Sequence, residues 1–338
     1  MVIDFKNLKI KELNPETEFE KKIKNFLEEW ESGTPTVKVQ TSGSTGQPKI
    51  FEIEKKKMLN SAVMTCNFLE LKEGDIAVLC LPVEYISGKM MLVRSIERKL
   101  KLRVADLSLH PLKDLETEVD FCAMTPLQVE NSLEKLHLIK NLIIGGAAVS
   151  ESLKRKISGL TTHIYETYGM SETLSHIALK QLTPKPEDYF TVFENVSISK
   201  DERSCLTIMA PNVNDEKLHT NDLVEIKDEK QFRFLGRVDN VINSGGAKIF
   251  PEELEALVKK EISNETVFLG IKDESLGQKL IAVIEGEETG KMREVIMKIN
   301  FKKSFHKPKD IFFVDRIPRT PNGKVNRREL LELIINKN

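Results

Sequence analysis

Four hydroxyl side chains and two glycines make up the segment from Thr41 to Gly46, and Pro48 and Lys49 follow it closely. Small residues leave backbone N–H groups open to a ligand, and the lysine adds a cation, a combination that suits a polyphosphate. A flexible Ser/Gly linker is the plain alternative, but a linker needs neither the Pro-Lys ending nor the strand-like residues on both sides. No register fits the Walker A pattern, which disfavours a P-loop kinase or GTPase.

A second segment, Tyr168 to Glu172, brings an aromatic ring, a glycine, a hydroxyl and a carboxylate together within five residues. It follows the strand-like residues His163 to Tyr165. Aromatic faces stack on adenine, and carboxylates bind Mg²⁺ beside phosphates. The segment therefore predicts part of a nucleotide site, with an ordinary turn carrying an exposed acid as the alternative.

Two further signals are weak when taken alone. Gly145 to Ala148 lie between a predicted strand and a helix capped by Ser150, where tight packing of a turn is a sufficient explanation. Asp222 begins a predicted strand after Thr220 and Asn221. Its carboxylate can accept both hydroxyls of a ribose, or it can simply belong to a turn.

The composition indicates a globular chain that acts on small molecules. The 338 residues, 40% apolar and 30% charged, suffice for a sizeable core and two domains. A net charge of −1 argues against bulk attraction to nucleic acid or an anionic membrane. Met1 to Lys11 lack an apolar signal region, and no window approaches 18 uncharged apolar residues, so we expect a cytoplasmic protein without membrane insertion.

The cysteines are widely spaced and form no CxxC pair, so we expect reduced thiols rather than a metal cluster. Three of them lie in apolar runs and are expected to be buried. The four positions are Cys66, Cys80, Cys122 and Cys205.

Helix-like and strand-like segments alternate in the first half of the chain, which predicts a mostly parallel sheet with helices on both faces. Thr125 and Pro126 mark one helix start, as N-cap and first helical residue. Strands are expected at 76–81, 102–105, 119–124 and 142–144, and helices at 55–71 and 87–99. Ligands of such sheets bind at the carboxyl ends of the strands, where the candidate loops fall.

From Ile177 onward the pattern changes to short strands separated by polar turns, at 192–199, 205–209, 223–226 and 232–235, which predicts a β-rich subdomain. A break follows at Arg237 to Asp239. We therefore expect an α/β large domain of parallel and mixed sheets at 1–237 and a small, mobile α+β domain at 238–338. The basic run from Phe301 to Arg328 is expected to be a solvated face that can also meet an anionic ligand.

The order of these motifs identifies a family resemblance. The chain also carries the run from Gly236 to Glu253 and, near its end, Pro318 to Lys324. In combination, the motifs resemble those of the acyl-adenylate-forming superfamily, which includes acyl-CoA synthetases and the adenylation domains of peptide synthetases. The resemblance extends from about Thr41 to Arg328. Members of this superfamily have a longer N-terminal part, so the first domain is expected to be shortened.

The resemblance implies ATP, Mg²⁺ and CoA as ligands. Lys324 matches the catalytic lysine, Glu172 and Thr45 the Mg²⁺ site, Asp239 the hinge, and Gly245 with Gly246 the approach of CoA. Glu172 is also implied in catalysis. The nucleotide-binding positions implied are Thr41, Ser42, Gly43, Ser44, Thr45, Gly46, Lys49, Gly145, Gly146, Ala147, Glu166, Thr167, Tyr168, Gly169, Met170, Ser171, Asp222 and Arg237.

The acid pocket is expected around the run from Leu81 to Arg94. This run, with Ser175 to Ala178, resembles the o-succinylbenzoate:CoA ligases of menaquinone biosynthesis. A substrate with a second carboxylate needs a cation or hydrogen-bond donors there, although a lone lysine or histidine near a helix start also has purely structural uses. The acid-binding positions expected are Tyr85, Ser87, Gly88, Lys89, Arg94 and His176.

The activity implied is formation of an acyl-AMP from a carboxylic acid and ATP, followed by transfer of the acyl group to CoA. The best match for the acid is o-succinylbenzoate. An aryl or fatty acyl-CoA ligase of broader specificity is a second hypothesis, and an adenylating domain serving a separate carrier protein is a third. A nucleotide-binding regulatory module without catalysis is the alternative from another class. The oligomeric state is left open.

Overall fold

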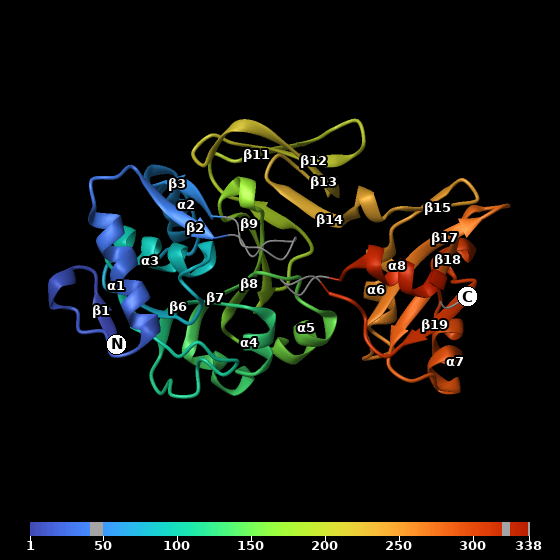
Figure 1. Cartoon of the computed structure of the whole chain (residues 1–338), viewed down its shortest axis with the longest axis horizontal. Helices are drawn as coiled ribbons and strands as arrows, with labels where there is room; N and C mark the ends of the chain where they lie inside the picture. The colour runs from blue at the N-terminus through green and yellow to red at the C-terminus, as the bar shows by residue number, and fades with distance from the viewer. Residues whose placement is uncertain (41–49, 320–324, 337–338) are drawn as a thin grey trace.

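The structure is a computed structural model that describes residues 1–40, 50–319 and 325–336. Within these ranges the strands form one large sheet, a five-stranded sheet near the C-terminus and a two-stranded ribbon. Figure 1 shows the large sheet in the body of the molecule and the five-stranded sheet beyond it, past β14. The alternation of strands and helices confirms the expected α/β class.

One half of the large sheet is parallel and has helices packed on it. Its strands, in spatial order, are β5 (Lys101–Val104), β4 (Ile76–Leu79), β6 (Val119–Met124), β7 (Ile139–Ile144) and β8 (His163–Gly169), with β1 (Val2–Asp4) antiparallel to β5 at the edge. The helices are α1 (Glu18–Glu31), α2 (Lys55–Phe68), α3 (Ile86–Arg98), α4 (Pro126–Glu130) and α5 (Glu151–Ile157). Thr125 caps α4 with Pro126 at its first position, as predicted.

The other half of the same sheet is antiparallel. Its strands, in spatial order from β8, are β9 (His176–Thr183), β10 (Phe190–Val192), β14 (Gln231–Arg237), β13 (Asn214–Ile226), β12 (Cys205–Ala210) and β11 (Ser197–Lys200). The β-rich region is therefore a continuation of the parallel sheet and not a separate one. The single strand expected at 192–199 was wrong, because residues 193–196 interrupt it.

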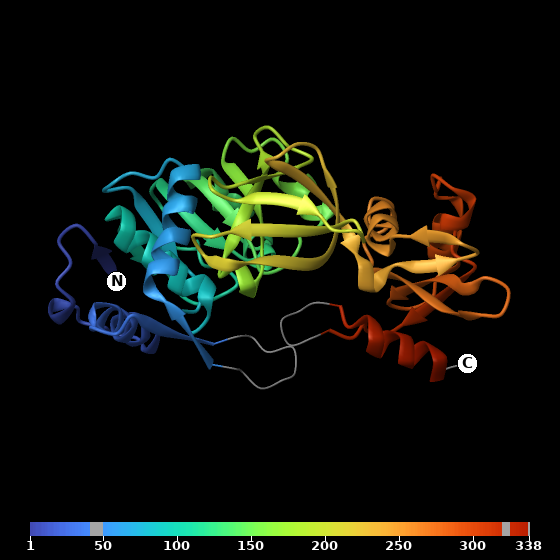
Figure 2. The same cartoon turned by 90° about the horizontal axis from the view of Figure 1, so that it is seen from above.

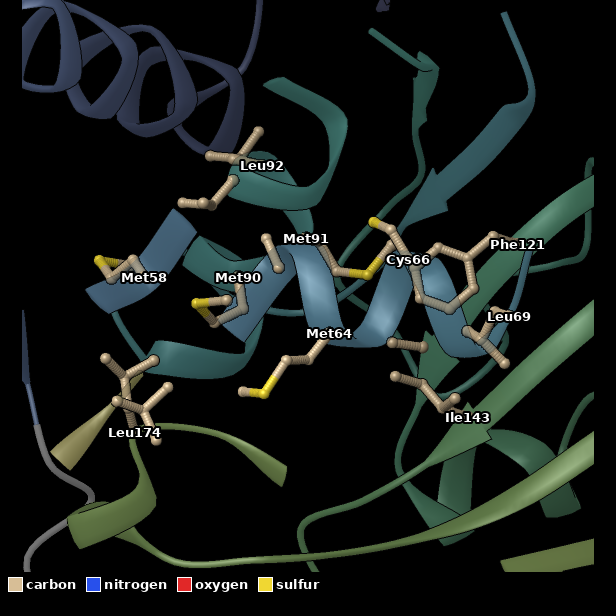
Figure 3. Close-up of a cluster of buried hydrophobic side chains, with 14 of the residues drawn as sticks. Met58, Met64, Cys66, Leu69, Met90, Met91, Leu92, Phe121, Ile143 and Leu174 are labelled. Atoms are coloured by element: carbon tan, nitrogen blue, oxygen red, sulfur yellow. The ribbon is translucent and has the colours of Figure 1, made fainter. Parts of the chain in front are cut away.

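Helices α2 and α3 pack against each other and against the large sheet through a core rich in methionine. Figure 3 shows Met64 and Cys66 of α2 near Met91 of α3, with Phe121 of β6 and Ile143 of β7 beside them. All four cysteines are free and buried, in agreement with the sequence prediction. Burial raises the pKa of the Cys66 thiol to about 11, so this thiol stays protonated at neutral pH.

The ribbon of β2 (Thr36–Gln40) and β3 (Ile50–Glu54) is antiparallel and stands beside α2. Gln40, the last residue of β2, forms an isolated bridge with Tyr85 at the start of α3. Within the described ranges, β2 pairs with no strand of the large sheet. Five short 3₁₀ turns complete the description: η1 (Ile10–Glu12), η2 (Leu133–Leu138), η3 (Ser171–Thr173), η4 (Val238–Asn240) and η5 (Ser304–His306).

The C-terminal sheet packs helices against both of its faces. Its strands are β15 (Ile242–Ser244), β16 (Ala247–Ile249), β17 (Thr266–Asp273), β18 (Gly277–Glu285) and β19 (Asp310–Val314), and the helices are α6 (Pro251–Val258), α7 (Gly290–Lys298) and α8 (Arg327–Asn336). Figure 2 shows α8 along the side of this sheet. The two sheets share no described strand, and η4 follows the last strand of the large one; the boundary at 237/238 and the mobility of the C-terminal part stay predictions.

The sequence interpretation missed helix α8, because Arg327 and Arg328 were assigned to a basic surface run. Arg327 is mostly buried instead, and its guanidinium pairs with the Glu255 carboxylate of α6 at 2.7 Å. Arg328 is exposed, as expected. Among the described residues, no helix is long and apolar enough to cross a membrane.

Helix α3 lies unusually close to the loop that precedes it, at Gly88. A Cβ atom on Gly88 would lie 2.3 Å from the carbonyl oxygen of Pro82, closer than real Cβ contacts allow. We therefore expect Gly88→Ala to lower the free energy of unfolding by about 2 kcal/mol, because backbone must move to admit the methyl group.

Denaturant unfolding of Gly88→Ala and of a matched variant, Gly290→Ala, measures this effect. Gly290 begins α7 and has no atom within 4 Å of the position a Cβ would take, so its substitution is expected to be neutral or slightly stabilising. Equal stability of the two variants would show that α3 can move away from Pro82 at no cost.

Candidate functional site

The turn after β7 lies against the neighbouring strand β8. Gly145 donates its N–H to the carbonyl of Met124 at 3.1 Å, and a Cβ on Gly145 would lie 2.9 Å from the Thr167 hydroxyl oxygen. Gly146 has a φ of 88°, which a glycine adopts without strain. Ala147 follows on the exposed side of the turn. The predicted adenine-side residues of this turn therefore adjoin Thr167.

Glu166 holds the end of this turn in place. It is paired with Ile144 across the parallel strands, and its buried carboxylate accepts the N–H of Val149 at 3.1 Å. The other carboxylate oxygen lies 2.9 Å from the Lys180 ammonium on β9. The sequence analysis expected Glu166 in the site but assigned no role to Lys180.

Tyr168 connects the adenine side of the site with the predicted ribose side. Its hydroxyl donates to the carboxylate of Asp222 on β13. Burial and the adjacent Asp222 carboxylate raise the pKa of Tyr168, so the phenol stays protonated and remains a donor. Its ring packs edge-on against Phe232, with centroids 4.9 Å apart, and near Phe190.

Arg237 lies between the predicted ribose ligand and the predicted hinge. One guanidinium nitrogen is 3.9 Å from the Asp222 carboxylate, and another is 3.0 Å from the Asp239 carboxylate. Asp239 also accepts from the side-chain amide of Asn221 at 3.1 Å. Asp222, Arg237 and Asp239 are thus adjacent, while the ribose role of the first two and the hinge role of Asp239 stay predictions.

The turn between β8 and β9 has a strained backbone. Leu174 has φ 66° and ψ −46°, and Ser175 donates its N–H to the carbonyl of Thr173 at 2.7 Å, which defines a γ-turn of the rare, strained kind. Glu172, with Met170 and Ser171 before it, is held at the exposed rim of this turn. Strained backbone of this type concentrates at functional sites, where surrounding contacts maintain it.

Gly169 fixes how the turn returns to the sheet. A Cβ on Gly169 would lie 2.5 Å from the Cα of His176 and equally close to the carbonyl oxygen of Ser175. The strand β8 thus runs to Gly169, four residues beyond the predicted strand that ended at Tyr165. Tyr168 and Gly169 belong to the strand rather than to the turn after it.

A buried chain of hydrogen bonds starts at Arg94 on α3. The guanidinium donates to the Ser175 hydroxyl at 3.2 Å, and this hydroxyl lies 3.4 Å from Nδ1 of His176. Nε2 of His176 lies 3.1 Å from the Thr65 hydroxyl, which itself donates to the carbonyl of Ser61. Because the single hydrogen of Thr65 is used for Ser61, His176 must carry its proton on Nε2, which leaves Nδ1 to accept from Ser175.

Burial shifts the pKa values of two side chains in this series of hydrogen bonds, His176 and Arg94. Burial, together with the nearby Arg94 charge, lowers the pKa of His176 well below its usual value, so the imidazole is neutral. Burial also lowers the pKa of Arg94 to about 10, which still leaves the guanidinium charged at neutral pH. Arg94 is 2% exposed and forms no ion pair with the described residues, and its Nε has no hydrogen-bond partner among them.

Lys89 lies apart from Arg94 and His176, although all three are expected acid-binding positions. Lys89 and Arg94 are five positions apart on α3, so the two side chains leave the helix in different directions. The Lys89 ammonium lies over the ring of Phe26 on α1, 4.6 Å from its centroid. Burial lowers the pKa of Lys89. Lys89 is therefore assigned to the contact between α1 and α3.

The remaining acid-pocket residues surround the start of α3. Tyr85 and Ser87 are exposed there, and Tyr85 bridges to Gln40, the last described residue before the predicted phosphate loop. Gly88 faces the carbonyl of Pro82, so its lack of a side chain serves packing of the helix. The structure thus places one residue of the predicted acid pocket, Tyr85, beside Gln40.

Gly245 and Gly246 form the tight turn of the β15–β16 hairpin, with φ 57° and 79°. Both values suit a two-residue turn of the type that glycine favours.

Residues 41–49 and Lys324 lie outside the described residues. This applies to eight expected site residues: Thr41, Ser42, Gly43, Ser44, Thr45, Gly46, Lys49 and Lys324.

Comparison with known proteins agrees with this arrangement. Residues 1–197, more than half of the chain, match the AMP-binding enzyme family. The chain belongs to this family, which confirms the resemblance found in the sequence. It is 34% identical to the acyl-CoA synthetase (AMP-forming)/AMP-acid ligase II-like protein of Dyadobacter fermentans, whose structure has a TM-score of 0.68; the match covers 99% of this chain and 100% of that one.

Longer relatives are more distant. A 2-succinylbenzoate–CoA ligase of Geobacillus sp. (strain WCH70) is 26% identical over 341 residues, covering 88% of this chain and 68% of that protein. The O-succinylbenzoate Coenzyme A synthetase of Bacillus subtilis, in complex with ATP and magnesium ion, has the same fold with a TM-score of 0.72 at 21% identity, covering 87% of this chain and 69% of that one.

Sequence reasoning missed three residues of the site: Thr65, Ser175 and Lys180. Each had a usable signal. Thr65 lies on the buried face of α2 beside Met58, Ala62 and Cys66, and Lys180 is a cation within a mostly buried strand, so each needed a polar partner. Ser175 precedes His176 but was taken only as part of a motif. Their partners lie on other elements, which a linear pattern does not reveal.

The neutral state of His176 leads to a pH-dependent stability. The pKa of His176 is lowered in the folded state. Below pH ~6.5 the histidine of the unfolded chain therefore binds a proton, while the buried histidine of the folded chain stays neutral. We expect the free energy of unfolding to fall with decreasing pH in that range, by up to about 1.4 kcal/mol per pH unit from this residue. Urea unfolding of wild type and His176→Gln at pH 7.5, 6.5 and 5.5 measures it.

His176→Gln should have a shallower pH dependence than wild type. The control is His110→Gln, because His110 is exposed and its substitution should leave the wild-type slope unchanged. If His176→Gln and wild type lost stability in parallel, His176 would not be the group that resists protonation.

Proposed function

We propose that this chain is an ATP-dependent acid:CoA ligase that forms an acyl-AMP and passes the acyl group to CoA. We further propose o-succinylbenzoate as its acid, and a place in menaquinone biosynthesis. The observation that carries the choice of acid is Arg94, a buried guanidinium without a carboxylate partner among the described residues. An unpaired buried charge is costly to maintain, and a second carboxylate on the substrate supplies the missing partner.

The neighbours of Arg94 support recognition of such a group. Ser175 and His176 connect the guanidinium to Thr65, so the donors are oriented before a ligand arrives. A guanidinium binds a carboxylate through two parallel hydrogen bonds, which selects for planar acids of the right reach. A monocarboxylic acid uses its only carboxylate for adenylation and leaves Arg94 unpaired.

The nucleotide part of the proposal rests on the residues around Tyr168. Asp222 and Arg237 are adjacent and suit the ribose hydroxyls, while Gly145 to Ala147 and Tyr168 suit the adenine edges. Glu172 is exposed at the rim and forms no described ion pair, so its oxygens suit Mg²⁺. Bound Mg²⁺ would neutralise phosphate charge.

The proposed reaction has two steps. A carboxylate oxygen of the acid attacks the α-phosphorus of ATP, and the bond to pyrophosphate breaks. The CoA sulfur then attacks the acyl carbonyl after losing its proton, and AMP leaves. A lysine ammonium stabilises the charge that gathers around the α-phosphate in the first step, the role proposed for Lys324 by resemblance.

A carrier-protein ligase is the second candidate. A 3,4-dihydroxybenzoate–[aryl-carrier protein] ligase of Bacillus anthracis is 26% identical over 332 residues and covers 91% of this chain and 75% of that protein. That activity shares the first step and differs in the acceptor thiol. Product analysis with CoA as the only thiol distinguishes the two candidates.

The proposed acid is tested by acid-dependent release of pyrophosphate. We expect o-succinylbenzoate to be turned over far better than benzoate or long-chain fatty acids. Arg94→Gln should raise KM for o-succinylbenzoate by about tenfold or more while KM for ATP stays within twofold, because a charged hydrogen bond to the second carboxylate is lost. Activity with benzoate should change little.

Lys89→Gln is the matched control, since it removes a buried cation from the same helix on a different side. It should leave KM for the diacid near the wild-type value. Equal rates for all acids would refute the diacid proposal, and a rise in KM for Lys89→Gln alone would transfer the role from Arg94 to Lys89.

The role proposed for Lys324 predicts different effects on the two steps. Lys324→Ala should slow acyl-AMP formation by about a thousandfold, which corresponds to roughly 4 kcal/mol of lost transition-state stabilisation. The variant should still convert supplied acyl-AMP and CoA into thioester, because thiol attack does not use that cation.

Asp239→Pro serves as the complementary variant, since it stiffens the predicted hinge and should chiefly impair thioester formation. Rapid-quench assays of each half-reaction measure both effects. Equal slowing of both steps by Lys324→Ala would contradict a lysine that acts in adenylation only.

A further inference from the structure

Lys180 is a charged side chain within the large sheet to which the proposed reaction assigns no role. It lies on β9 directly opposite Glu166 on β8, and its ammonium is 2.9 Å from the Glu166 carboxylate. The two side chains are 14% and 10% exposed. Because little water screens this pair, it constrains both side chains more firmly than a surface ion pair does.

The Glu166 carboxylate connects Lys180 to the turn after β7. Its second oxygen accepts the N–H of Val149 at 3.1 Å, and Val149 ends the segment that starts at Gly145. A carboxylate that has lost its cation prefers water to a single backbone donor. Lys180 therefore keeps Glu166 turned toward Val149, and through it holds the turn 145–149 against β8.

Lys180 also contacts the aromatic side chains behind Tyr168. Its ammonium lies 4.4 Å from the ring centroid of Phe190, a cation–π contact. Phe190 stacks on Phe232, with centroids 5.5 Å apart, and Phe232 supports the ring of Tyr168. One ammonium thus connects the two groups of residues that the proposed function places at adenine.

We propose that Lys180 is a positioning residue for the nucleotide, which sets the separation between the turn 145–149 and the ring of Tyr168. This inference rests on the proposed function, in which these two elements border the adenine. A planar base fits between two surfaces only if their spacing is held before it binds, so loss of the spacing weakens affinity without touching the reacting atoms.

Direct binding of AMP tests this role, because it needs no turnover. Lys180→Met keeps an unbranched side chain and removes the charge, whereas Lys180→Arg keeps the charge. We expect Lys180→Met to raise Kd for AMP and KM for ATP by about tenfold. KM for the acid and the inhibition constant of pyrophosphate should stay within twofold, since neither ligand contacts the adenine side. Lys180→Arg should recover most of the affinity.

Two comparisons separate positioning from general stability. Lys259→Met breaks a 3.1 Å ion pair with Glu265 in the C-terminal part, and it should lower Tm without changing Kd for AMP. Glu166→Gln with Lys180→Met should weaken AMP binding by less than the two single effects combined, because the two residues share one contact. If Lys180→Met does not fold, Lys180→Gln and Glu166→Gln enter the same binding assay.

Unchanged AMP affinity in Lys180→Met, or in its replacement Lys180→Gln, with a lower Tm would overturn the inference and leave Lys180 a structural residue. A parallel rise in KM for the acid and in the pyrophosphate constant would also overturn it, since the whole site would then be disturbed. Failure of the proposed function gives a different result: wild type itself would bind neither AMP nor ATP.

Discussion

The close approach of Gly169 to His176 is the constraint on which the site depends. There the parallel half of the large sheet meets the antiparallel half, and the two backbones are too near for a Cβ atom between them. This contact ends β8 and sets the register in which β9 starts. The register shifts by one residue between Gly169 and Tyr168, and in the shifted register Lys180 lies opposite Glu166. On the other side of Gly169's contact, the Ser175 hydroxyl accepts a hydrogen bond from Arg94 on α3. The close contact at Gly169 thus lies between the residues proposed for the nucleotide and those proposed for the acid.

The strained turn before Ser175 follows from the same constraint. A chain that must reverse within a few residues and still bury Leu174 has few conformations available, and the γ-turn at Leu174 is held by hydrogen bonds of Thr173 to both Met170 and Ser175. Glu172 is exposed, whereas Thr173 and Leu174 after it are buried. The structure therefore combines a rigid base with a carboxylate at the rim, an arrangement that suits a metal ion shared with phosphates.

Much of the fold was predictable, because strands β4, β6 and β7 are apolar runs and α4 has a clear cap at Thr125. The sequence did not predict that the sheet continues through β9, because it shows where strands occur but not which of them pair. Tyr168, Asp222 and Arg237, which the resemblance assigns to one nucleotide site, do lie side by side. The separation of Lys89 from Arg94 is inherent in their spacing of five positions on a helix, whereas the contact of Lys89 with Phe26 on α1 is not visible in the sequence. Lys180 and Thr65 have their partners on other elements, and only the folded chain joins them.

The methionine-rich contact between α2 and α3 bears on the range of acids that the family fold can accept. Thr65 of α2 and Arg94 of α3 both reach the polar chain around His176, so any acid that displaces one helix relative to the other must deform the core between them. Unbranched thioether side chains such as Met64, Met90 and Met91 change rotamer with little loss of packing, and sulfur tolerates varied contacts. The helices can therefore shift by small amounts without opening a cavity. A methionine-rich core of this kind can absorb small changes in the distance between α2 and α3 while the polar residues around His176 keep their contacts.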